Sequence, residues 1–77
     1  MNSTNLYNAK PTEMLQITYI PNIGMLEGLG LRYGTKLKIQ NKYVFGGPVL
    51  LRVEEAFSIA LGKDIATQIG VEEVVYS

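Results

Sequence analysis

The chain has 77 residues, of which 47% are hydrophobic and 18% are charged, and its formal net charge at pH 7 is zero. This length is that of one small domain, and the composition is too apolar for a disordered chain. Because cysteine and histidine are both absent, disulfide bonds, thiolate catalysis and the usual zinc sites are excluded, and we expect no enzyme activity, no bound metal and no cofactor.

The two ends of the chain carry no clear periodic pattern. We predict a single domain over residues 1–77 in which residues 1–5 and 74–77 are loose tails. The first residues contain neither a basic cluster nor an apolar segment, so a secretory signal is not expected. No apolar run approaches the roughly 20 residues that a membrane span needs. We therefore expect a cytoplasmic protein with no direct membrane insertion.

The first regular elements are a strand and a short helix. Apolar and polar residues alternate over residues 15–19, and this period of two predicts a half-buried strand. Asn22 is expected to cap one or two helical turns that contain Met25 and Leu26. Gly28 limits the length of this helix, because glycine lowers helix propensity and commonly follows a helix end.

The middle of the chain predicts two further strands. Residues 32–35 have the composition of a turn in which Gly34 takes a positive φ. The amphipathic stretch 35–41 follows as a strand with one buried face. A glycine-containing loop at 45–48 then leads into a strand over residues 49–53.

The last third of the chain predicts a hairpin and a second helix. A short reversal at 54–56 leads into a strand over residues 57–61. A helix of one or two turns is expected over residues 65–69, capped by Asp64 or Lys63. Val71 is then expected to close the barrel as a final short strand. Five or six short strands with glycine corners and two or three short helices describe a mainly β, SH3-like small barrel.

The charges are unevenly distributed along the sequence. Basic residues gather between 32 and 52, whereas acidic residues predominate in the last third. Either the two signs mingle on the folded surface, or a basic face meets an acidic partner or an anionic membrane leaflet. Tyr33, Tyr43 and Phe45 lie among the basic residues, as in single-strand RNA platforms. The zero net charge argues against nucleic-acid binding, which we do not expect.

A set of motifs carries a family resemblance. The matching positions are the Leu-Gly-Leu corner at Leu26, Leu29, Gly30 and Leu31, the turn Tyr33-Gly34-Thr35 with the strand Lys36 to Ile39, the strand start Gly46-Gly47-Pro48-Val49, and the closing signature at Ile59, Ala60, Leu61, Ala66, Ile69 and Val71. From about Leu6 to Val71 the chain resembles the FeoA family, the small cytoplasmic A component of the bacterial ferrous iron transport system.

Several positions depart from that family's pattern. Met25 and Gly62 stand where arginine is common, and Tyr33 stands where proline is common. Thr12 replaces a glycine, and the turn at 54–56 lacks the customary glycine. Because these positions lie at turns and on the surface, they leave the predicted fold intact and put partner contacts made by the absent arginines in doubt.

The resemblance implies a function in transport. An FeoA-like protein would bind the cytoplasmic part of the GTP-hydrolysing membrane permease for ferrous iron and would support or regulate Fe(II) uptake. It would be cytoplasmic and peripheral to the inner membrane through this partner. The same domain also occurs at the C-terminus of metal-dependent transcriptional repressors. The alternative function is a free-standing SH3-like binding module for RNA or a proline-rich peptide, and the oligomeric state stays open.

The residues expected to contact a partner border a groove between the long loops of such a barrel. They are Arg32, Tyr33, Tyr43, Phe45, Pro48 and Arg52. The alternative is that the aromatic rings of this set only cap the barrel.

Overall fold

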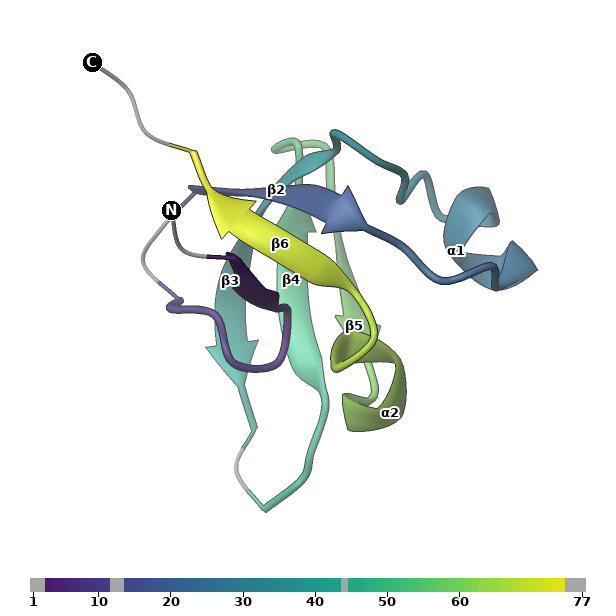
Figure 1. Ribbon diagram of the computed structural model, residues 1–77. Helices are drawn as coiled ribbons and strands as arrows, with labels where there is room; N and C mark the ends of the chain where they lie inside the picture. Colours follow the sequence, from purple (N-terminus) through teal and green to yellow (C-terminus); the bar gives the residue numbers. More distant parts are fainter. Residues whose placement is uncertain (1–2, 12–13, 44, 75–77) are drawn as a thin grey trace.

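The computed structural model describes residues 3–11, 14–43 and 45–74, with one strand-rich body and a short helix at its side (Figure 1). Over these residues the chain forms six strands and two short helices. In chain order they are β1 (Ser3–Asn5), β2 (Met14–Tyr19), α1 (Gly24–Gly28), β3 (Lys36–Lys42), β4 (Val49–Val53), β5 (Phe57–Leu61), α2 (Lys63–Ala66) and β6 (Gly70–Glu73).

The strands form one antiparallel sheet in the order β1-β6-β2-β3-β4-β5. Antiparallel pairing joins β2 through to β5 in chain order, and β6 returns to lie between β1 and β2. The pairing shifts register in β2 between Ile17 and Tyr19 and in β3 between Ile39 and Asn41, and such irregularities bend a sheet. The bent sheet folds over itself, as Figure 1 shows where β2 and β6 pass across β3 and β4.

The predicted fold class, a mainly β, SH3-like small barrel, is confirmed. Val71 lies in a final short strand, β6, as predicted, and this strand pairs with β1 and β2. The predicted closure of the barrel was wrong, because the sheet of the described residues keeps two edges, β1 and β5. The apolar side chains therefore pack inside the bend of an open sheet and not inside a closed barrel.

The core lies inside the bend of the sheet and draws on both helices. The strand β4 alternates buried and half-buried residues, and the first part of β3 alternates exposed and buried ones, as the period of two predicts. The buried apolar residues are Leu6, Ala9, Leu15, Ile17, Leu26, Leu31, Leu37, Ile39, Val49, Leu51, Val53, Leu61, Ala66, Ile69 and Val71.

The predicted loose tails are partly ordered. Residues 3–5 form β1, so the prediction of a tail was wrong there. The reason is the next residue, Leu6, whose side chain is fully buried and whose N–H donates to the carbonyl of Ile69 at 2.9 Å. At the other end, the N–H of Val74 donates to the carbonyl of Met14 at 2.9 Å. The rest of the predicted tails, residues 1–2 and 75–77, lies outside the described residues.

Both helices begin at residues other than those predicted. Ile23 and not Asn22 is the N-cap residue of α1, and it makes no side-chain capping bond. A tight turn, in which the Ile23 N–H donates to the Pro21 carbonyl at 2.8 Å, places Asn22 before the cap. Gly62 is the N-cap residue of α2, which ends at Ala66, so the prediction of a helix over 65–69 capped by Lys63 or Asp64 was wrong.

Candidate functional site

The predicted contact residues lie at opposite ends of β3. Arg32 and Tyr33 precede this strand, whereas Tyr43, Phe45 and Pro48 follow it. A strand of 7 residues spans about 20 Å at the usual rise of about 3.3 Å per residue. These residues therefore do not line one common groove but belong to two separate surfaces.

The loop that carries Arg32 and Tyr33 is held in shape by Thr35, which is 4% exposed. The Thr35 hydroxyl accepts a hydrogen bond from the Arg32 N–H at 3.1 Å and donates one to the Gly30 carbonyl at 3.3 Å. Gly34 takes a φ of 90°, as predicted, and Gly30 takes a φ of 83°. The loop thus presents Tyr33, which is 72% exposed, from a fixed backbone.

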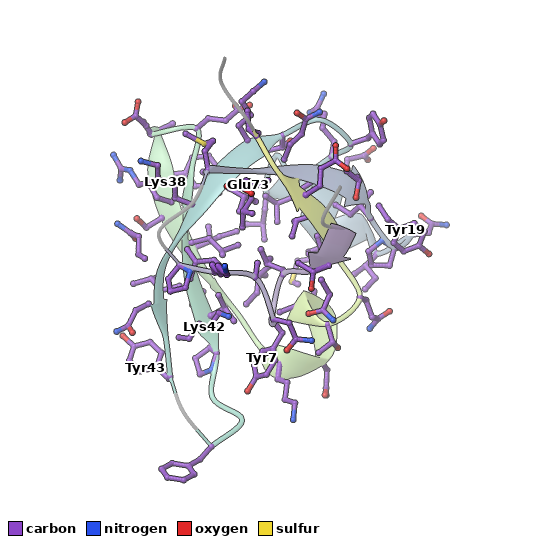
Figure 2. All side chains as sticks on the ribbon, turned by 60° about the vertical axis from the view of Figure 1, so that its left-hand side comes forward. Tyr7, Tyr19, Lys38, Lys42, Tyr43 and Glu73 are labelled. Carbon is purple, nitrogen blue, oxygen red and sulfur yellow. The ribbon has the colours of Figure 1, made fainter. Side chains whose placement is uncertain are left out.

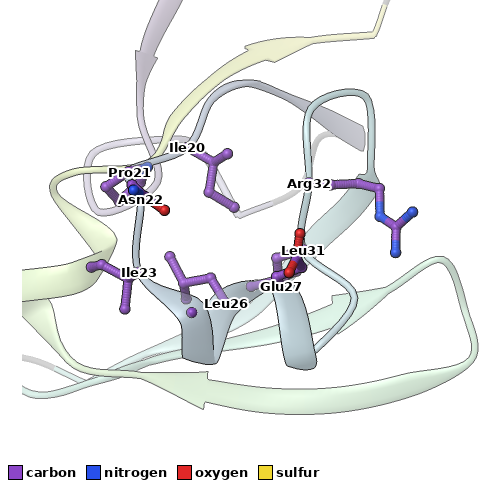
Figure 3. Close-up of a pocket in the computed structure, with 9 residues that line it drawn as sticks. Ile20, Pro21, Asn22, Ile23, Leu26, Glu27, Leu31 and Arg32 are labelled. Carbon is purple, nitrogen blue, oxygen red and sulfur yellow. The ribbon is translucent and has the colours of Figure 1, made fainter.

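A pocket of about 270 Å³ opens beside this loop, between α1 and the segment that follows β2. Figure 3 shows Ile20, Ile23 and Leu26 around it, with the Arg32 guanidinium extending outward at its rim. Its volume is slightly below the roughly 300–1,000 Å³ of sites that bind small molecules. A pocket of this size can receive a side chain of another protein.

We call the pocket together with Arg32 and Tyr33 the α1 surface. Of its pocket residues, the sequence prediction named only Arg32. The others lie within residues 20–31, where the segment after β2, the helix α1 and the following loop adjoin. One signal was present: Ile20 and Ile23 are apolar residues on either side of Pro21-Asn22, outside any predicted strand or helix face. The side chains of both residues are partly buried and pack against the core.

Arg52 is engaged within the fold. Its Nη2 donates to the Glu55 carbonyl at 2.9 Å, and its Nη1 donates to the Ser58 hydroxyl at 3.5 Å. The Ser58 hydroxyl in turn donates to Gln40 Oε1 at 2.8 Å. Arg52 therefore braces the β4–β5 turn, in which Glu54 and Glu55 hold φ values of 48° and 59° that glycine adopts more readily.

The β3–β4 hairpin loop, residues 43–48, carries the remaining predicted residues. The Tyr43 N–H donates to the Pro48 carbonyl at 3.1 Å, which closes the loop. Phe45 has a relative exposure of 102% and Tyr43 one of 49%. A phenylalanine ring without any covering neighbour is unusual on a folded surface and marks the loop as a second contact candidate.

The α1 surface presents aromatic, aliphatic and charged groups, and the hairpin loop presents the rings of Tyr43 and Phe45. Within residues 3–11, 14–43 and 45–74, no group of three or more acidic, cysteine or histidine side chains is placed to hold a metal ion. Over the same part of the chain, no helix is long and apolar enough to cross a membrane.

The model of one protein family, described as the FeoA domain, matches residues 4–73. This match extends over nearly the whole chain, including both candidate surfaces. Among curated proteins, none matches the sequence.

Solved structures share the fold. The crystal structure of an iron uptake regulatory protein, FeoA, superposes with a TM-score of 0.83 at 21% identity, covering 96% of this chain and 100% of that one. The NMR structure of an FeoA-like protein from Clostridium acetobutylicum gives 0.80 at 23% identity, covering 100% and 93%. A manganese-dependent transcriptional repressor in complex with manganese gives 0.85 at 14% identity, covering 96% of this chain but 38% of the repressor. At these identities the likeness shows the fold alone.

Proposed function

Since this chain belongs to the FeoA domain family and its role therefore lies in ferrous iron transport, we propose that it binds the cytoplasmic part of the membrane ferrous iron permease through the α1 surface. The observation that carries the proposal is a pocket with Ile20, Ile23 and Leu26 around it, next to a loop that exposes Tyr33.

The composition of the α1 surface supports a protein partner. Tyrosine and arginine are enriched among the residues that dominate binding energy, and such residues lie at the edge of pockets that exclude water. Tyr33 and Arg32 adjoin a pocket whose inner wall includes the buried side chains of Leu26 and Leu31. An apolar side chain of the permease would enter this pocket while Tyr33 packs against its flank.

The rigidity of the loop also supports binding. Ordering a flexible segment on association opposes binding by about 0.5–1.5 kcal/mol for each immobilised side chain. The hydrogen bonds of Thr35 fix the backbone of the loop before any partner arrives. The rim carries Glu27 and Arg32, which are opposite charges and would orient the partner.

Retention of the full-length permease, solubilised in detergent, on the tagged chain tests this function. We expect Tyr33→Ala to weaken retention about tenfold, which corresponds to about 1.4 kcal/mol. The matched control is Tyr43→Ala, which removes another exposed tyrosine at the far end of β3 and is expected to leave retention unchanged. Both variants should melt close to the parent, because the Tyr33 side chain is 72% exposed and the Tyr43 side chain is about half exposed.

Two outcomes would overturn the proposal. One is that the parent chain retains no permease. The other is that Tyr33→Ala retains as much permease as Tyr43→Ala does.

A further inference from the structure

The hairpin loop places the ring of Phe45 fully in solvent. Phe45 and Gly46 both lie in the left-handed region, with φ values of 61° and 79°. This conformation is unfavourable for a residue with a side chain. The loop is nevertheless closed by its own hydrogen bond, and Gly47 packs so closely that a Cβ there would lie 2.8 Å from Tyr43 Cβ. A left-handed backbone at Phe45, in a loop closed by a hydrogen bond, thus accompanies a ring that lies fully in solvent.

Lysine side chains accompany the loop. Lys42 is the last residue of β3, directly before the loop. Lys63, the first residue of α2, places its Cδ 4.0 Å from the position that a Cβ on Gly46 would take. Its Nζ lies 5.4 Å from the centre of the Tyr7 ring. Aromatic rings and ammonium groups therefore share this end of the molecule.

The other end of the molecule carries acidic groups together with Lys36, Lys38 and Arg52. Figure 2 shows Tyr7, Lys42 and Tyr43 at one end of the molecule, and Glu73 with Lys38 toward the other. The β4–β5 turn with its two glutamates also lies at the far end of β3, because Val53 pairs with Leu37 and Val49 pairs with Lys42. Near the loop, α2 contributes Asp64 beside Lys63. The hairpin end is thus aromatic with a basic excess.

We propose that the β3–β4 hairpin loop is a membrane-contacting tip that rests on an anionic lipid bilayer, with Phe45 and Tyr43 at the headgroup level and Lys42 and Lys63 facing lipid phosphates. Aromatic rings accumulate at membrane interfaces, and each basic residue near an anionic leaflet contributes about 1 kcal/mol. A ring that projects fully into solvent from a turn suits a soft interface such as the headgroup region of a bilayer. The contact is shallow, at the level of the headgroups, and differs from insertion into the membrane.

This contact does not depend on the permease, but it complements the proposed function. A chain that touches the bilayer with its hairpin tip stays close to a membrane partner, while the α1 surface remains free at the other end of β3. The attraction is weak and reversible, because only two rings of the loop and two neighbouring lysines take part.

The test uses the full chain and lipid vesicles without permease. Because the sequence contains no tryptophan, Phe45→Trp introduces a single fluorescent reporter at the tip. We expect its emission to shift to shorter wavelength with vesicles containing phosphatidylglycerol, and to return on addition of salt. Vesicles of phosphatidylcholine alone should produce a much smaller shift.

Sedimentation with the same vesicles gives the second readout. Phe45→Ser is expected to reduce the fraction of protein bound to phosphatidylglycerol vesicles at least about fivefold, whereas Tyr33→Ala leaves it unchanged. Emission that does not respond to anionic vesicles overturns the proposal, as does equal binding by Phe45→Ser and the parent. Loss of permease retention in detergent by Phe45→Ser, with no vesicle response, would assign the tip to a protein contact instead.

Discussion

Gly47→Ala is expected to lower the free energy of unfolding by about 1–3 kcal/mol, the usual range for an added methyl group without space. The new Cβ would lie 2.8 Å from Tyr43 Cβ and 3.2 Å from the Tyr43 carbonyl oxygen. The second of these atoms belongs to the backbone, so relief requires the loop to open and to lose the 3.1 Å hydrogen bond from Tyr43 to Pro48. Urea unfolding followed by circular dichroism measures the change.

The matched control for this substitution is Gly62→Ala. Gly62 has a φ of −64°, which alanine adopts freely, and nothing lies within 4 Å of the position that the alanine methyl group would take. We expect its unfolding midpoint to stay at the parent value or to rise slightly. Equal midpoints for Gly47→Ala and Gly62→Ala would show that the hairpin loop is not packed as described. If the loop opens, Gly47→Ala should also reduce binding to anionic vesicles.

The second large effect is expected at Thr35. Thr35→Val keeps the shape of the side chain but removes the hydroxyl that bonds to the Arg32 N–H and the Gly30 carbonyl. Leaving such groups without a partner costs about 1–2 kcal/mol of stability, so the unfolding midpoint should fall. Because the same bonds hold the loop that carries Tyr33, permease retention should fall in the same variant.

A conservative variant distinguishes the effect of the Thr35 hydroxyl from the effect of its packing. Thr35→Ser keeps the hydroxyl and loses only a methyl group, so it should retain the permease nearly as well as the parent. A result in which Thr35→Ser and Thr35→Val retain the permease equally would contradict the role assigned to the hydroxyl.

The strands were the most predictable part of the fold. The segments predicted at 49–53 and 57–61 match β4 and β5, and those at 15–19 and 35–41 match β2 and β3 within one residue at each end. One face of β2, β3 and β4 is buried, so the period of two is strong in the sequence. The strand β1 carries no such signal, because Ser3, Thr4 and Asn5 are all polar. It exists because Leu6 is anchored in the core and aligns the preceding residues with β6.

The site was less predictable than the fold. Composition identified the exposed aromatic residues Tyr33, Tyr43 and Phe45, but the distance between them depends on the length and direction of β3. Arg52 has the residue type of a contact residue, yet its guanidinium is bonded within the β4–β5 turn. The pocket of the α1 surface is formed within residues 20–32, but its shape depends on how the segment after β2, the helix α1 and the following loop pack together.

Hydrogen–deuterium exchange on the full chain, with and without the full-length permease in detergent, tests the binding surface most directly. We predict slower amide exchange in the segment from Ile20 to Tyr33 and unchanged exchange in the hairpin loop and in β1. Exchange that is unchanged throughout the chain, or protection confined to segments outside 20–33, would contradict the assignment of the α1 surface as the site of permease binding.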